Sequence, residues 1–155
     1  MRWRIRAIGL LAAAAAATAV TPAAAQVRDA VYRGTLVCKK LPFTEAAMRE
    51  AIDVTITGGA AVRYTHVVRL RETPEAAMEQ GTGKVDGPRI SLQGSWKGDA
   101  GQYQAAYEGS FVRRSAKLIG TQTWTHQGRI ITRSCTGVIK RPFRAFLPGD
   151  KKPGK

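Results

Sequence analysis

Short runs in which apolar and polar residues alternate cover most of the chain from Val31 to Lys140. Alternation with a period of two is typical of β-strands that bury one face. Residues that favour turns, such as glycine, proline and aspartate, separate these runs. The pattern predicts eight strands, at roughly 31–39, 51–57, 61–70, 81–85, 89–96, 103–111, 116–126 and 129–140.

The links between the predicted strands determine how neighbouring strands run. Five links are short enough for hairpins, which makes the strands that they join antiparallel. They are 58–60, 86–88, 98–101, 113–115 and 127–128. The two longer links, 40–50 and 71–80, could each start a helical turn, with Thr44 or Thr73 as the N-cap and Pro74 at the first helical position. Neither is long enough to be a main element.

The turn at Gln127-Gly128 allows the register of the last hairpin to be predicted. A two-residue turn there pairs residues whose numbers add up to 255, which places Trp124 opposite Ile131 and Gln122 opposite Arg133. The other face of this strand carries threonines 121, 123 and 125, which belong in water. The face with Trp124 therefore points inward, and the same test gives one inward face through nearly every predicted strand. Such a sheet either folds over as a sandwich or closes as a barrel.

The two cysteines favour the barrel. Cys38 faces inward on the first predicted strand and Cys135 faces inward on the last. An even-stranded up-and-down barrel brings its first and last strands side by side and antiparallel, within disulfide range. The sequence therefore predicts an all-β fold, an eight-stranded antiparallel up-and-down barrel whose first and last strands are linked by a Cys38–Cys135 disulfide. The layout resembles that of the calycins, which include lipocalin-like and avidin-like barrels, although the Gly-x-Trp expected near the first strand is missing.

Composition and charge add a cellular compartment to this picture. The chain has 155 residues, with 25 Lys and Arg against 11 Asp and Glu, a net charge of +14. Residues 1–25 have three arginines before an apolar stretch and end in Ala23-Ala24-Ala25, which predicts a cleavable Sec-type signal peptide and a periplasmic or secreted protein. The barrel domain is then expected at 26–141, and 142–155 as a basic, poorly ordered tail.

The inward polar and aromatic residues are the candidates for a binding site. His66, Gln122 and Arg133 should not face inward unless they are paired, lie near a mouth or bind something. Large rings that could line a pocket accompany them, and several inward glycines leave space or let the strands coil. The candidate ligand-binding residues are Arg133, Gln122, Trp124, Trp96, Tyr64, His66 and Tyr107.

Catalytic and metal-binding constellations were not found in the sequence. There is no Gly-x-Ser-x-Gly, no His-Glu-x-x-His and no inward carboxylate pair, because Glu108 and Asp53 fall on the outward phase. The spacing of the cysteines and of His66 and His126 does not resemble a zinc site. No catalytic residue, metal or cofactor is therefore expected.

Two functional hypotheses follow from these features. The first is an exported, non-catalytic barrel that binds a small apolar or aromatic ligand, with an anionic group at Arg133. The second is a filled barrel whose basic surface docks on anionic envelope polymers or lipid head groups. Nucleic acid is not expected as a partner, because an exported protein rarely meets it. A cavity lined by the large rings and Arg133 would favour the first hypothesis, and a packed interior the second.

Overall fold

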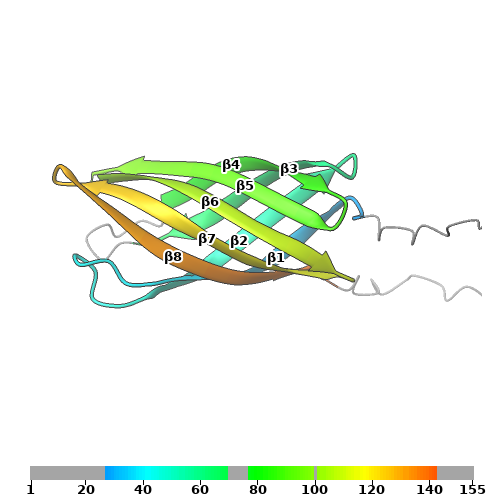
Figure 1. Ribbon diagram of the computed structural model, residues 1–155, viewed down its shortest axis with the longest axis horizontal. Helices are drawn as coiled ribbons and strands as arrows, with labels where there is room; N and C mark the ends of the chain where they lie inside the picture. The colour runs from blue at the N-terminus through cyan, green and yellow to red at the C-terminus, as the bar shows by residue number, and fades with distance from the viewer. Residues whose placement is uncertain (1–26, 70–76, 100, 143–155) are drawn as a thin grey trace, which may run out of the picture.

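The computed structural model describes residues 27–69, 77–99 and 101–142. Eight antiparallel strands follow one another around a closed barrel in sequence order (Figure 1). Each side chain on the inner face is followed by one on the outer face, as the alternating pattern predicts. The strands are β1 (Ala30–Cys38), β2 (Met48–Thr57), β3 (Ala61–Val68), β4 (Ala77–Asp86), β5 (Arg89–Gly98), β6 (Gly101–Val112), β7 (Ser115–His126) and β8 (Arg129–Lys140).

Pairing between the first and last strands closes the barrel. β1 pairs antiparallel with β8, and Cys38 lies directly opposite Cys135. These two residues form a disulfide with a Cα–Cα distance of 4.0 Å, across 97 positions of the chain. The predicted fold class and the predicted disulfide are both confirmed, and the described residues contain no free cysteine.

The predicted register of the last hairpin is confirmed, but some strands begin earlier than predicted. Trp124 pairs with Ile131 and Gln122 with Arg133, as the sum of 255 requires. However, β4 starts at Ala77 rather than at residue 81, and β2 starts at Met48 rather than at residue 51. Both strands extend into links that were predicted as loops, β2 by three residues and β4 by four.

The link between β1 and β2 contains no helical turn. The hydroxyl of Thr44 accepts a hydrogen bond from the backbone N–H of Leu41 at 2.8 Å. Thr44 therefore closes a turn with the residues that precede it, and no helix follows it. The second predicted helical turn, at Thr73, falls in 70–76 and lies outside the described residues. The predicted signal peptide and most of the predicted tail also lie outside them. No described helix has the length and apolar character that crossing a membrane requires.

The two ends of the barrel differ in what fills them. We call the end with the β1–β2 connection, 39–47, and the β7–β8 turn the loop end, and the opposite end, with the turns at 58–60, 87–88 and 113–114, the turn end (Figure 1). The interior near the turn end is almost wholly apolar; it contains Ile56, Val62, Val85, Ile90, Phe111, Leu118 and Ile139. The buried polar side chains lie in the other part of the barrel, toward the loop end.

Two inward glycines make room for a large ring. A Cβ added at Gly81 or at Gly94 would overlap the ring or hydroxyl of Tyr64, which lies across both residues. Gly81 and Gly94 are themselves opposite each other on β4 and β5. These glycines are therefore not empty space, because the side chain of Tyr64 occupies the volume that they leave.

Removing the disulfide should lower stability without changing the topology. We expect replacement of both Cys38 and Cys135 with alanine to lower the free energy of unfolding by roughly 4 kcal/mol, because the crosslink restricts a long loop of the unfolded chain. Denaturant titration of the oxidised protein and the double variant measures this difference. A loss below about 1 kcal/mol would show that the β1–β8 pairing does not need the crosslink.

Candidate functional site

A fully buried carboxylate, Glu79, lies at the centre of the polar interior. It is on β4, two residues before Gly81, and its side chain is completely excluded from solvent. The sequence analysis placed Glu79 in a loop and assigned no inward carboxylate, and the structure corrects this. Continuing the alternation of Val85, Gly83 and Gly81 by one more step would have placed Glu79 inward.

Glu79 is held by hydrogen-bond donors from three other strands, β3, β6 and β7. Its Oε1 accepts from the hydroxyl of Tyr64. Its Oε2 accepts from the hydroxyls of Tyr103 at 2.6 Å and Tyr107 at 3.2 Å. The Nδ1 of His66 lies 2.9 Å from the same oxygen, and the amide of Gln122 lies 3.5 Å from it. A buried carboxylate requires such donors, because it has lost its hydration.

The three phenols around Glu79 are held in their protonated form. Burial raises the pKa of Tyr64, Tyr103 and Tyr107, because the phenolate would be poorly solvated, and the adjacent charge of Glu79 raises each pKa further. Each hydroxyl therefore keeps the proton that it donates. The cluster acts as a set of fixed donors and offers no ready acid or base among its tyrosines.

One nitrogen in this cluster has no partner. His66 contacts Glu79 through Nδ1, whereas its Nε2 is buried and forms no hydrogen bond with any described residue. A buried polar atom without a partner costs free energy. A ligand atom or an ordered water at Nε2 would remove that cost.

Gln122 connects the Glu79 cluster with Arg133. The amide nitrogen of Gln122 donates to the hydroxyl of Tyr107 at 2.8 Å, while its Oε1 accepts from Nε and Nη2 of Arg133 at 2.8 and 2.5 Å. The Nη1 of Arg133 reaches only the carbonyl of Lys39, at 3.5 Å. Arg133 as a whole is 4% exposed, and burial lowers the pKa of its guanidinium.

Arg133 has no carboxylate beside it. Among the described residues, no Asp or Glu oxygen lies within ion-pair distance of its guanidinium. Glu79 is the only buried carboxylate among the described residues, and its oxygens already accept hydrogen bonds from the residues around it. Arg133 donates instead to the neutral amide oxygen of Gln122. A buried cation is normally paired with an anion. The positive charge of Arg133 is therefore solvated by dipoles but not neutralised by a direct partner.

Aromatic rings surround Arg133 toward the loop end. Its guanidinium carbon lies 5.2 Å from the ring centroid of Trp124, which is within cation–π range. Trp124 packs against Tyr103 at 4.5 Å and Trp96 at 5.7 Å between ring centroids. These rings form an apolar and polarisable wall beside the cation.

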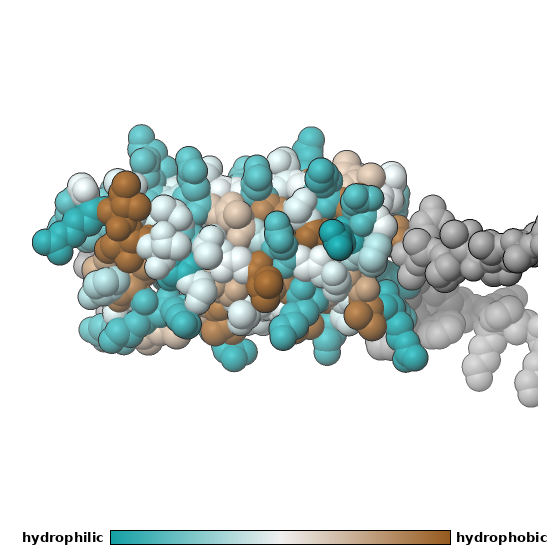
Figure 2. All heavy atoms as spheres, viewed as in Figure 1, coloured by the Kyte–Doolittle hydropathy of each residue, from teal (hydrophilic) through white to brown (hydrophobic). Residues whose placement is uncertain are grey.

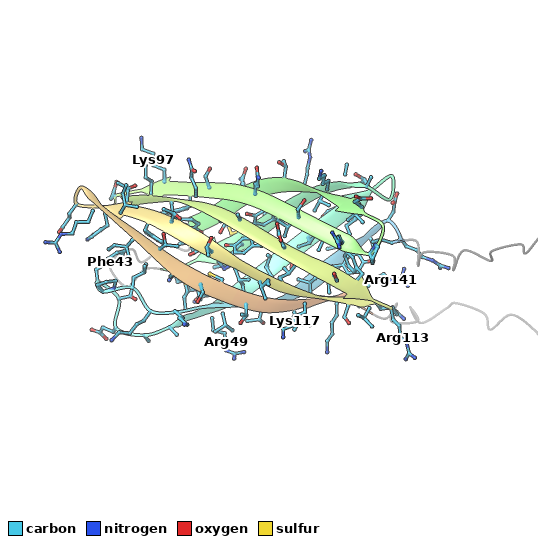
Figure 3. The ribbon with its side chains drawn as sticks, in the orientation of Figure 1. Phe43, Arg49, Lys97, Arg113, Lys117 and Arg141 are labelled. Atoms are coloured by element: carbon cyan, nitrogen blue, oxygen red, sulfur yellow. A yellow bond between two sulfur atoms is a disulfide. The ribbon has the colours of Figure 1, made fainter. Side chains whose placement is uncertain are left out.

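The connection between β1 and β2 covers this aromatic wall. Phe43 lies 5.8 Å from Trp124 in an edge arrangement and stacks on His126 at 4.0 Å between ring centroids. Figure 3 shows Phe43 over the loop end of the barrel. Leu41 of the same connection is buried. Access to Arg133 from this end therefore depends on the position of residues 39–47.

The structure divides the predicted ligand-binding residues into two groups. Arg133, Gln122, Trp124 and Trp96 lie together toward the loop end. Tyr64, His66 and Tyr107 surround Glu79 instead. The structure does not test whether either group binds a ligand. Sequence reasoning missed Glu79, Tyr103 and Phe43 as members of the site, and only Glu79 and Tyr103 carried a signal, their inward phase.

Two hollows among the described residues lie on the outside of the barrel. One, of about 690 Å³, crosses the outer faces of β4 to β7 near the turn end. The other, of about 450 Å³, lies over the outer faces of β5 to β8 near the loop end, and Trp96 and Tyr103 are among the residues that line it. The described residues contain no group of three His, Cys, Asp or Glu side chains placed to hold a metal ion.

Comparison with known proteins gives little beyond the fold. No protein-family model matches the chain, and no curated protein matches its sequence. The crystal structure of rhizavidin is similar to this chain, with 11% identity and a TM-score of 0.48, over 85% of this chain and 98% of rhizavidin. The function of the site must therefore be argued from its own side chains.

Alkaline titration should reveal the buried tyrosines. All four tyrosines lie in the barrel and have a raised pKa in the folded state. The folded protein therefore holds phenolic protons that the unfolded chain releases near pH 10, so stability is complete below about pH 10 and falls as the pH rises above it. We expect tyrosinate absorbance to appear only together with unfolding, in one cooperative step. A gradual rise in absorbance with the far-UV signal unchanged would contradict the burial of these hydroxyls.

Removing the buried carboxylate should strongly destabilise the protein. Glu79→Ala leaves several buried donors without an acceptor, and we expect a loss of roughly 3 kcal/mol or more in the free energy of unfolding. Glu108→Ala is the control, because Glu108 is an exposed glutamate on the outer face, and its effect should stay within about 0.5 kcal/mol. Similar losses in both variants, measured by denaturant unfolding, would contradict the central role of Glu79.

Proposed function

We propose that this protein is an exported, non-catalytic barrel that binds a small ligand at the loop end, through an aromatic or apolar body and an anionic group. The observation that carries the proposal is the buried guanidinium of Arg133 without a carboxylate partner. An anionic ligand group would neutralise this charge and accept hydrogen bonds from it. The rings beside it supply a surface for the rest of the ligand.

The guanidinium nitrogen of Arg133 that lacks a close acceptor indicates where the anion would lie. Nε and Nη2 are directed to Gln122, whereas Nη1 has only the distant carbonyl of Lys39. Lys39 begins the connection that covers the loop end. An anion at Nη1 would therefore lie between the guanidinium and residues 39–47, at the boundary of the barrel interior and its cover.

Around Tyr64 and Glu79 the interior is packed, as the second hypothesis expects, so the ligand proposed here can lie only near the mouth at the loop end. Tyr64 occupies the space over Gly81 and Gly94, and the Glu79 cluster uses the hydroxyls behind it. These contacts leave Trp96, Trp124 and Arg133 as the surfaces nearest the loop end. The proposed ligand is therefore small and lies near the mouth, with Phe43 over it.

Export and the lack of catalysis complete the proposal. The basic residues before an apolar stretch and the Ala23-Ala24-Ala25 site support a periplasmic or secreted location. The phenols of the interior cluster are fixed as donors, which supports binding rather than acid–base chemistry. Mass spectrometry of small molecules that co-purify with the protein from its native host would identify the ligand class.

Replacing Arg133 with methionine should abolish anion binding and keep the fold. The probe is 8-anilinonaphthalene-1-sulfonate, an aromatic anion, and the readout is energy transfer from Trp96 and Trp124, the two tryptophans of the barrel. We expect Arg133→Met to weaken the binding of this probe by roughly tenfold or more, because it removes the cation that pairs with the sulfonate. Its unfolding free energy should stay within about 1 kcal/mol of wild type or rise, since an unpaired buried charge is removed.

Arg129→Met is the matched control for this variant. Arg129 lies on the same strand, is exposed and carries the same charge. Its probe affinity should change less than about twofold, as expected for a surface charge. Equal weakening in both variants would show that the probe binds the basic surface. A loss of stability of about 3 kcal/mol or more in Arg133→Met would show that the arginine is structural.

A further inference from the structure

The larger of the two outer hollows is a groove lined by both apolar and basic side chains. It has a volume of about 690 Å³ and crosses β4, β5, β6 and β7 near the turn end. Lys84, Arg89 and Lys117 line it together with Val112 and Ile119. We call these five residues the groove set. Asp86 and Glu108 line the groove as well, so three bases face two carboxylates, and Arg113 follows Val112 at the adjacent turn.

Strand register holds the groove set on one face. Lys84 lies opposite Ser91, Ser91 opposite Glu108, and Glu108 opposite Ile119, in one row across four strands. The next row toward the turn end contains Arg89, Ser110 and Lys117. Residues in such rows point to the same side of a sheet. The groove is therefore built into the regular structure of the barrel.

The apolar members of the groove set are unusually exposed. Val112 is 70% exposed and Ile119 is 56% exposed. On the face formed by β5 to β8, such apolar side chains stand between strongly polar ones (Figure 2). Covering exposed apolar side chains with a partner is favourable, because it removes apolar surface from water.

The charges of the groove are available to a partner. Lys84, Arg89, Arg113 and Lys117 form no ion pair with any described residue, and neither do Asp86 and Glu108. Figure 3 shows Arg113 and Lys117 extending outward from the barrel wall. Four cations against two carboxylates favour an anionic partner. They disfavour a second copy of this chain, which has the same positive charge.

We propose that the groove set is a docking surface for an anionic phospholipid membrane. The negative potential of such a membrane attracts each lysine or arginine near its surface with a favourable free energy of about 1 kcal/mol. A hydrated soluble polyanion would satisfy the lysines and arginines but would leave Val112 and Ile119 in water. The interfacial region of a bilayer accepts both kinds of side chain. The exposed apolar residues are thus the observation that favours a membrane over a soluble polymer.

This surface and the proposed ligand site belong to different parts of the barrel. The groove set lies near the turn end, whereas Phe43 lies over the loop end (Figure 3). Phe43 contacts Trp124, whose ring lies beside Arg133. A molecule docked through the groove leaves its loop end free to exchange ligand with water. The docking proposal does not depend on ligand binding, and the two can fail separately.

Vesicle co-sedimentation of the whole exported protein tests the docking surface. The vesicles are phosphatidylcholine alone and phosphatidylcholine mixed with phosphatidylglycerol. We expect binding only to the mixed vesicles, and the triple variant Lys84→Gln, Arg89→Gln, Lys117→Gln should weaken it by roughly tenfold or more. The control triple variant Arg49→Gln, Lys97→Gln, Arg129→Gln removes the same charge from exposed positions near the loop end and should weaken it less than about threefold. Residues 143–155 are unchanged in every variant.

A second pair of variants tests the apolar contribution. Val112→Thr with Ile119→Thr keeps β-branched side chains in the strands and should weaken vesicle binding at high salt, where apolar contacts dominate. Met78→Thr with Ile130→Thr is the control, because both of those residues are exposed elsewhere on the barrel, and it should leave binding unchanged.

Four results would overturn the proposal. The first is no binding of the wild-type protein to mixed vesicles, and the second is equal weakening by the two charge variants, which would indicate diffuse attraction. The third is equal weakening by the two apolar pairs. The fourth is a combination of two results: heparin binding that is weakened by the Lys84, Arg89 and Lys117 variant, and vesicle binding that is unchanged by the Val112 and Ile119 variant. That combination would assign the groove to a soluble polyanion.

Discussion

The buried charge of Glu79 constrains the interior of this barrel more than any other single group. A carboxylate that has lost its water must be surrounded by donors, and the chain supplies them from β3, β6 and β7. Tyr64 can reach Glu79 because Gly81 and Gly94 leave room for its ring. Gly81, Gly94 and the three phenols around Glu79 thus belong to one buried arrangement.

The same requirement determines the state of Arg133. Glu79 is the natural partner for a buried cation, but its oxygens are taken up by hydroxyls and by His66. Gln122 separates the two charges: its amide nitrogen faces the Glu79 cluster and its oxygen faces the guanidinium. An amide can serve both neighbours because it is donor and acceptor at once. The chain thereby keeps a positive charge near the loop end that a direct ion pair would have neutralised.

Much of the fold could be predicted from the sequence, because the signals are local. The short turn at Gln127-Gly128 and the threonines of β7 specify the last hairpin, and the inward phase of Cys38 and Cys135 specifies closure. The Glu79 cluster could not be predicted in this way. Residues 77–80 belong to a link in which a helical turn was predicted, and they place a charged side chain, Glu79, at the inward position, so β4 was predicted to begin only at Gly81. Contacts across the lumen, such as Glu79 with Tyr107, also join strands that are not neighbours, and pairwise register does not specify them.

The two ends of the barrel differ in the polarity of their interiors, and the two proposed sites lie at different ends. Apolar side chains fill the interior at the turn end, so the outer surface there can vary without disturbing buried polar contacts. At the loop end the interior polar groups lie close to the β1–β2 connection, and Arg133 contacts its first carbonyl directly. The disulfide at Cys38 anchors that connection where it leaves β1. The surroundings of Arg133 therefore include both the barrel wall and the β1–β2 connection, whereas the hydrogen bonds of the Glu79 cluster lie within the barrel.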